Sequence, residues 1–253
     1  MRIVSYNILD GGEGRADPIA EVLIAQRPDI VALIEADNAA VVARVASRLK
    51  MDSITAVGHR HSVAVLSHWP IIESVNHAML REEFSNCFLE AAVRDPLGAD
   101  WILGLTHLHP HAREADDFIR MREVSTILAV FGERRRENIP HILLGDFNAD
   151  SPIQQIDPAR CKPSTQKAWR DNGGHLPTGA VQSMLSAGYL DTLHELNGEQ
   201  AARRGTFSTQ YPEQRVDYIF AHGFENQLRS AWIEHDRLAQ FASDHFPVGA
   251  EIQ

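Results

Sequence analysis

Short apolar runs alternate along the chain with segments whose apolar residues recur every three or four positions. Unbroken runs of β-branched and large apolar residues indicate buried strands, and the three-to-four spacing indicates amphipathic helices. Strands and helices that alternate in this way are typical of an α/β protein. The predicted strands are Ile3–Tyr6, Ile30–Ile34, Val63–Ser67, Phe88–Arg94, Trp101–Thr106, Ile142–Leu144, Val216–Ala221 and Val248–Ile252.

Helices are predicted between several of these strands. The first is expected to start with Asp17 as its N-cap and Pro18 at the first helical position, and to close at Pro28. Three more are expected: one with Val41, Val42, Val45 and Leu49 at helical spacing, a long one over Glu114–Arg136, and a short one around Val181–Ala187. The stripe expected to face the core in the long helix consists of Phe118, Met121, Val124, Leu128 and Phe131.

Residues 151–179 interrupt the regular pattern. Prolines recur through this segment, it contains the pair Gly173-Gly174, and its apolar residues show little periodicity. We therefore expect a long loop, and loops of this length are often functional. The chain has no low-complexity linker and no strong internal repeat, so residues 1–253 are expected to form a single domain.

The composition is that of an ordinary globular protein. Apolar residues make up 44% of the chain and charged residues 23%, and no apolar run approaches the roughly 18 residues of a membrane span. Because the N-terminus shows no leader pattern, we expect a cytoplasmic protein. We also expect a monomer. Two cysteines do not suggest a disulfide framework; we expect a partly buried Cys87 and an incidental loop residue at Cys161.

The net charge of −10 bears on the substrate. Proteins that grip duplex DNA without sequence preference usually carry a basic face, since phosphate neutralisation supplies most of their affinity. The acidic balance therefore favours a small or single-stranded phosphorylated substrate over long duplex DNA.

Polar residues lie at or just beyond the ends of several apolar runs, or inside them. In α/β folds the strand ends converge on one rim, where ligand sites gather. Several carboxylates with an asparagine and no cysteine form an oxygen-rich set, which suits Mg²⁺ or Mn²⁺. Each residue alone has an ordinary structural explanation, such as a turn or a cap, and only the joint set indicates a site: Glu35, His107, Asp146, Asn148, Asp217 and His245.

The order and spacing of these residues resemble the endonuclease/exonuclease/phosphatase superfamily, which has the DNase I-like fold. Gly145-Asp146-Phe147-Asn148 together with Ser243-Asp244-His245 carries most of the resemblance. Further matches are Tyr6-Asn7, Leu33-Ile34-Glu35, Val65–Ile71, Thr106-His107-Leu108 and Arg215–Phe220, so the likeness spans almost the whole chain. The resemblance implies a four-layer sandwich, in which two packed mixed β-sheets are flanked by helices and the site lies at one rim.

The resemblance also implies roles by position. Glu35, with Asn7 beside it, is similar to the principal metal ligand of the family, and Asp244 is expected to bind metal directly or through water. Asp146 resembles the base that activates the attacking water. Asn148 would hold that water or a phosphate oxygen. His107 would donate to the phosphate or the leaving oxygen. Asp217 would pair with His245, so that the imidazolium of His245 stabilises charge on the phosphoryl oxygens.

The activity implied is a divalent-metal-dependent phosphoesterase that hydrolyses phosphodiester bonds with an activated water. A phosphomonoesterase of the same fold is the alternative. Residues His107, His109 and His111 also allow a zinc hydrolase, because alternate strand positions face one way, although Ala112-Arg113 breaks the expected continuation. A non-catalytic binding protein is a further alternative, against which the complete residue set argues.

The substrate is not determined by these motifs. The segments that separate members of the superfamily correspond here mostly to residues 151–179 and 198–212, where Phe207 stands at a place that some nucleases fill with an aromatic near the substrate. We expect a phosphorylated substrate, including single-stranded or damaged nucleic acid. Gly58–His61 is interpreted as a solvated loop, and Arg215 is a weak candidate for a substrate contact.

Overall fold

The twelve strands form two six-stranded sheets. The computed structural model describes all 253 residues. The first sheet has the order β11-β12-β1-β2-β4-β3 and the second the order β5-β6-β7-β8-β10-β9. The strands are β1 (Arg2–Asn7), β2 (Ile30–Ile34), β3 (Asp52–Ala56), β4 (Val63–Ser67), β5 (Ile71–Asn76), β6 (Cys87–Arg94), β7 (Asp100–His107), β8 (His141–Asp146), β9 (Leu190–Asp191), β10 (Asp217–His222), β11 (Leu228–Ile233) and β12 (Val248–Ile252).

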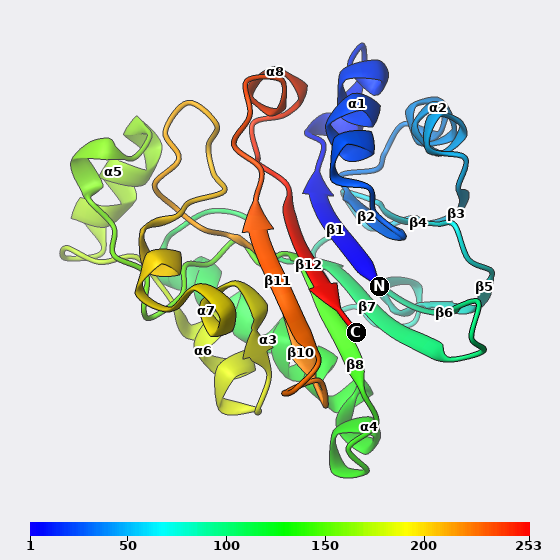
Figure 1. Cartoon of the computed structure of the whole chain (residues 1–253). Helices are drawn as coiled ribbons and strands as arrows, with labels where there is room; N and C mark the ends of the chain where they lie inside the picture. Colours follow the sequence, from blue (N-terminus) through cyan, green and yellow to red (C-terminus); the bar gives the residue numbers. More distant parts are fainter.

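The chain has eight α-helices, and Figure 1 shows them around the two sheets. They are α1 (Ala16–Gln26), α2 (Ala39–Leu49), α3 (Glu114–Val130), α4 (Gly132–Arg136), α5 (Pro163–Asp171), α6 (Gly179–Ser186), α7 (Thr192–Asn197) and α8 (Ala239–Ala242). Helices α1 and α2 pack together, as do α3 and α6. No helix is long and apolar enough to cross a membrane.

Both sheets are mixed, and one core joins them. In each sheet one pair is parallel, β1 with β2 and β7 with β8, while the other neighbours are antiparallel. A contiguous cluster of 63 buried apolar residues takes members from both sheets, so the sheets are packed face to face. The predicted sandwich of two mixed sheets flanked by helices is confirmed.

The strands that the sequence pattern missed lie at or beside the sheet edges. Strands β3 and β11 close the two sides of the first sheet, and β5 and the two-residue β9 close those of the second. Edge strands are only partly covered, so they carry polar residues and lack a long apolar run. The sequence Asp52–Ala56, for instance, has a single buried residue at its end, Ala56.

Three helix predictions need correction. Helix α1 begins at Ala16, so Asp17 lies inside it and pairs with Arg44 and Arg48 of α2, at 2.9 Å each, and is not its N-cap. The long helix predicted over Glu114–Arg136 is broken at Phe131 into α3 and α4. Within α3, Phe118 is 66% exposed and Met121 39%, because the inward face is largely polar and carries Asp117, Arg120 and Glu123.

The segment 151–179 is also more regular than predicted. It contains a 3₁₀ turn at Pro158–Arg160 and the whole of helix α5, whose first residue is Pro163. Proline at the first turn of a helix is favourable, so the prolines that suggested a loop include a helix start. Cys161, expected to be an incidental loop residue, is buried just before this helix, and Cys87 is fully buried in β6.

Candidate active site

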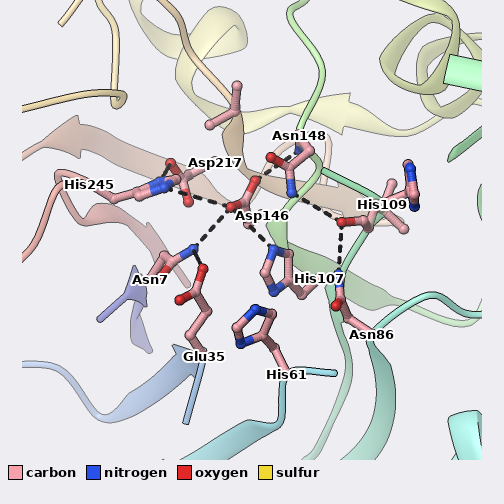
Figure 2. Close-up of polar contacts among 12 residues, drawn as sticks. Asn7, Glu35, His61, Asn86, His107, His109, Asp146, Asn148, Asp217 and His245 are labelled. Atoms are coloured by element: carbon pink, nitrogen blue, oxygen red, sulfur yellow. Dashed lines mark hydrogen bonds and ion pairs between the residues drawn. The ribbon is translucent and has the colours of Figure 1, made fainter. Parts of the chain in front are cut away.

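The candidate residues come from the ends of adjacent strands in both sheets. In the second sheet Asp146, the last residue of β8, lies opposite His107 of β7 on one side and Asp217 of β10 on the other. In the first sheet Asn7 ends β1 opposite Ile34, so Glu35 follows at the next position. His245 lies just before β12. Figure 2 shows these side chains converging on Asp146.

A glycine permits the close approach of β7 and β8 beside Asp146. Gly145 has a φ of +135°, and a Cβ built there would lie 1.9 Å from the carbonyl oxygen of Thr106. A side chain at this position would push the two strands apart. Gly145 therefore allows β7 and β8 to pair closely, in the register that places His107 opposite Asp146.

Asp146 is the centre of the site. Its Oδ2 accepts a hydrogen bond from Asn7 Nδ2 at 3.0 Å, and its Oδ1 accepts one from the backbone N–H of Asn148 at 2.8 Å. The same Oδ2 lies 3.7 Å from His107 Nε2 and 3.8 Å from His245 Nε2. Burial and the nearby charge of Asp217 raise the pKa of Asp146 to about 7, against the lowering effect of His245 and the two hydrogen bonds.

The two histidines beside Asp146 differ in charge. Burial alone lowers the pKa of His245, but its hydrogen bond to Asp217, 2.8 Å from Nδ1 to Oδ2, and the charges of Asp217, Asp146 and Asp244 raise that pKa to about 10. Burial lowers the pKa of His107 to about 4, and the charge of Glu35 only partly opposes it. His245 is thus an imidazolium at neutral pH, whereas His107 is a neutral ring in contact with a carboxyl group and not half of an ion pair.

Glu35 is fixed by two N–H donors. Asn7 Nδ2 donates to its Oε1 at 3.0 Å, and the backbone N–H of Asp10 donates to its Oε2 at 2.6 Å. Burial tends to raise the pKa of Glu35, but His107 and these donors outweigh it, so the pKa is lowered and the side chain is a carboxylate. Asn7 in turn is held through its Oδ1, which accepts from the N–H of Leu9 at 3.0 Å.

Asp244 and Asn148 complete the predicted set. Asp244 lines the hollow in front of Asp146, and its Oδ1 is buried without a hydrogen-bond partner. Burial raises the pKa of Asp244, a tendency that His245 and Lys162 oppose. Asn148 lines the same hollow and donates from Nδ2 to the carbonyl oxygen of Leu108 at 3.0 Å. All eight predicted residues therefore lie in one region. Six of them line the hollow, Asn7 donates to Asp146, and Asp217 is hydrogen-bonded to His245.

The residues present suit a divalent cation. The carboxylates of Glu35, Asp146 and Asp244 border one hollow of about 500 Å³. Asp244 Oδ1 is a buried acceptor without a hydrogen bond, with His245 Nε2 3.9 Å away, so it can accept a further donor or a cation. Oxygen donors of this kind are the ligands that Mg²⁺ and Mn²⁺ favour.

Several predicted contacts are not formed. The ring nitrogens of His109 bond to Ser85 Oγ at 3.0 Å and to Asp116 Oδ1 at 3.3 Å. His107, His109 and His111 therefore do not form a three-histidine metal site. Arg215 is buried and forms a bidentate pair with Asp191, with Nη1 to Oδ1 at 2.8 Å, and is not available to a substrate.

Sequence reasoning missed two residues of the site. His61, placed in a solvated loop by the sequence pattern, packs on His107 with ring centroids 5.4 Å apart and lines the hollow. Lys162, just before α5, lies with its Nζ 3.8 Å from the centroid of the Phe207 ring, which in turn packs on His245 at 4.6 Å. No local pattern marks either residue, because their positions depend on how distant segments fold onto the rim.

Comparison with known proteins identifies the family and similar folds. The sequence model described as the endonuclease/exonuclease/phosphatase family matches residues 4–245. The chain is similar in structure to a 3′–5′ exonuclease from Neisseria meningitidis, with 18% identity, a TM-score of 0.73 and complete coverage of both chains.

Two further solved structures are similar. An AP endonuclease from Archaeoglobus fulgidus has 18% identity and a TM-score of 0.70, and a 3′ phosphatase from Neisseria bound to a product DNA hairpin has the same two values. Each is covered over 99% of its length and covers all of this chain. No curated protein is similar enough in sequence to count as a relative.

Proposed function

Because the chain belongs to the endonuclease/exonuclease/phosphatase family and is therefore a divalent-metal-dependent phosphoric ester hydrolase, we propose that it cleaves phosphodiester bonds, in nucleic acid or a small phosphodiester. The observation that supports this best is the position of Asp146, whose Oδ2 lies between Asn7, His107 and His245 at the base of the hollow. A carboxyl group with a pKa of about 7 is suited to accept a proton near neutral pH.

The side chains divide the work of hydrolysis. Asp146 removes a proton from water as the water oxygen attacks phosphorus, with Asn148 orienting that water or a phosphate oxygen. The imidazolium of His245, held by Asp217, stabilises negative charge on the phosphoryl oxygens, and the ring N–H of His107 donates to the phosphate or to the leaving oxygen.

The metal would be held by Glu35, with Asn7 beside it, and by Asp244, which lines the same hollow. A divalent ion there supplies charge neutralisation and lowers the pKa of bound water. We infer Mg²⁺ or Mn²⁺ from the oxygen-rich donor set. The carboxylates repel one another and the substrate without a cation, so removal of metal is expected to abolish activity.

The walls of the hollow favour a short or flexible substrate. Helix α5 and residues 110–113 line the hollow of about 500 Å³ together with the catalytic residues, and Asn172 just after α5 donates to the carbonyl oxygen of Ala112 at 2.7 Å. The net charge of −10 also disfavours tight binding to long duplex DNA. The AP endonuclease and the DNA-bound 3′ phosphatase among the similar structures support nucleic acid as the substrate class.

Four substrates separate the possibilities: bis-p-nitrophenyl phosphate, p-nitrophenyl phosphate, a single-stranded oligonucleotide and a duplex with an abasic site, each with Mg²⁺, Mn²⁺ or a chelator. We expect hydrolysis of the diester and the single strand with metal, and none with chelator. Hydrolysis of the monoester alone would contradict a phosphodiesterase and establish the phosphomonoesterase alternative.

A further inference from the structure

His61 is held at the edge of the site by a carboxylate of its own. Its Nδ1 lies 2.8 Å from Asp37 Oδ2, and the other oxygen of Asp37 accepts a hydrogen bond from the N–H of Ser62 at 2.6 Å. The ring also packs on His107, with centroids 5.4 Å apart. These contacts fix the ring and leave Nε2 as the nitrogen without a protein partner.

The ring faces two carboxylates that the same rim brings together. One nitrogen of His61 and one carboxylate oxygen each of Asp10 and Glu35 lie within 4.8 Å of one another. Figure 2 shows His61 beside Glu35 and beneath His107. His61 and Glu35 both line the hollow in front of Asp146. Three potential ligands, two oxygens and one nitrogen, therefore surround one point at the side of the hollow.

A second group of similar composition behaves differently. Asp146, Asp217 and His245 also lie within 4.8 Å of one another, but Asp217 and His245 bond to each other at 2.8 Å and Asp146 is bonded by Asn7 and Asn148. Most of the polar atoms in that group are therefore already bonded, although Asp217 Oδ1 is buried without a hydrogen-bond partner. His61 has its orienting carboxylate on Nδ1 and keeps Nε2 without a protein partner, an arrangement that metal-binding histidines generally share.

We propose that His61 is a ligand of the divalent ion held by Glu35, with Asp10 as a further ligand and Asp37 as the residue that orients the ring. This inference rests on the proposed metal-dependent function and adds a nitrogen donor to a site otherwise built from oxygens. Imidazole binds first-row transition ions more strongly than Mg²⁺, which prefers carboxylate and water oxygens. The protein should therefore bind Mn²⁺ in preference to Mg²⁺, and His61 should be the cause.

The test measures metal binding directly. Pulsed electron paramagnetic resonance of the Mn²⁺-loaded protein reports nitrogen coupled to the ion, and calorimetric titration gives the affinities for Mn²⁺ and Mg²⁺. In the wild type we expect a ¹⁴N signal and tighter binding of Mn²⁺. In His61→Gln we expect loss of that signal and a fall in Mn²⁺ affinity of about tenfold or more, with less than about threefold change for Mg²⁺.

Two other variants complete the design. Asp37→Asn keeps the imidazole but weakens its orientation, so Mn²⁺ affinity should fall by less than in His61→Gln. His68→Gln is the matched control, because His68 is exposed just beyond the opposite end of β4 and should leave both affinities unchanged. Circular dichroism confirms that each variant is folded; His61 is only partly buried, with 32% of its side chain exposed.

The outcomes separate this inference from the proposed function. If His61→Gln kept the ¹⁴N signal and the wild-type Mn²⁺ affinity while metal-dependent hydrolysis continued, the assignment of His61 would be overturned and the function would stand. If the wild type bound neither ion and hydrolysed no phosphoester with either, both would be wrong.

Discussion

At the scale of single residues, the site depends on giving two neighbouring histidines opposite charge. His107 and His245 both lie within 4 Å of Asp146 Oδ2, yet the pKa of the first is about 4 and that of the second about 10. The largest contribution to the high pKa of His245 comes from Asp217, which is hydrogen-bonded to His245 and not to His107. His107 is thus a neutral N–H donor and His245 a positive charge. This combination suits a phosphoester, in which the nonbridging oxygens carry charge and the leaving oxygen needs a hydrogen-bond donor.

Replacing Asp217 by asparagine tests this division. Asp217 raises the pKa values of both His245 and Asp146 by its charge, so Asp217→Asn should lower both. Activity that needs ionised Asp146 and protonated His245 rises with pH near 7 and is lost near 10. Both limbs of the pH–rate profile should move to lower pH, and the maximal rate should fall by about 10²–10⁴-fold, as for other orienting carboxylates. Unmoved limbs would mean that other groups titrate.

Replacing Lys162 tests the wall formed by α5. Its ammonium group is half-buried over Phe207 and has no carboxylate within 4.0 Å, so a substrate phosphate is its natural partner. Lys162→Met should raise KM for an oligonucleotide by about tenfold or more, since a charged hydrogen bond contributes about 1.5–3 kcal/mol. Lys50→Met is the control, because Lys50 is exposed just after α2 and does not line the hollow. Equal effects of the two substitutions would argue against a specific contact.

At the scale of elements, the central strands were predictable and their surroundings were not. Strand β2 is buried at all five positions and reads as an apolar run, and the polar residues after such strands stood out for that reason. The sequence pattern did not predict the buried face of helix α3, because that face is polar. Arg120 and Glu123 are buried there and form hydrogen bonds with the backbone of His109, and an apolar stripe does not reveal such a face. His61 was missed because its neighbours Glu35 and His107 are distant in sequence.

The pairing of β7 and β8 offers a prediction at this scale. Gly145→Ala places a Cβ 1.9 Å from the Thr106 carbonyl oxygen, so the strands must separate. We expect a loss of about 3 kcal/mol or more in the free energy of unfolding, measured with urea, together with reduced activity, because Asp146 is the next residue. Gly14→Ala is the control: its φ is also positive, at +72°, but nothing lies within 4 Å, so about 1 kcal/mol is expected. Equal midpoints would contradict the close approach.

At the scale of the whole molecule, the site exists only because the two sheets end at the same rim. Glu35 and Asn7 belong to the first sheet, whereas His107, Asp146 and Asp217 belong to the second. The contiguous core that joins the sheets supports the proposal that residues 1–253 are one folding unit. The site should then be lost in a single cooperative transition with the fold.

Acid should destabilise the molecule through a buried histidine away from the site. Burial lowers the pKa of His141 to about 4, although the carbonyl oxygen of Ile139 opposes this, and Nε2 lies 2.7 Å from the hydroxyl of Tyr189. An unfolded histidine binds a proton near pH 6.5, so stability is lost as pH falls from 6.5 to 4, by at most about 3 kcal/mol.

The double variant His141→Phe with Tyr189→Phe removes that proton-binding group and its partner together. Urea unfolding between pH 7.5 and 4 should show a smaller loss of stability on acidification than in the wild type. The same pH dependence in both proteins would assign the effect to other groups.

The central claim is that Asp146 activates water in a metal-dependent hydrolysis, and Asp146→Asn tests it most directly. Asparagine keeps the size of the side chain and an oxygen that accepts from Asn7 or Asn148, but it cannot take a proton at neutral pH. We predict that hydrolysis of bis-p-nitrophenyl phosphate with Mg²⁺ or Mn²⁺ falls by about 10²–10⁴-fold in the folded variant. A folded Asp146→Asn protein with the wild-type rate would contradict the account.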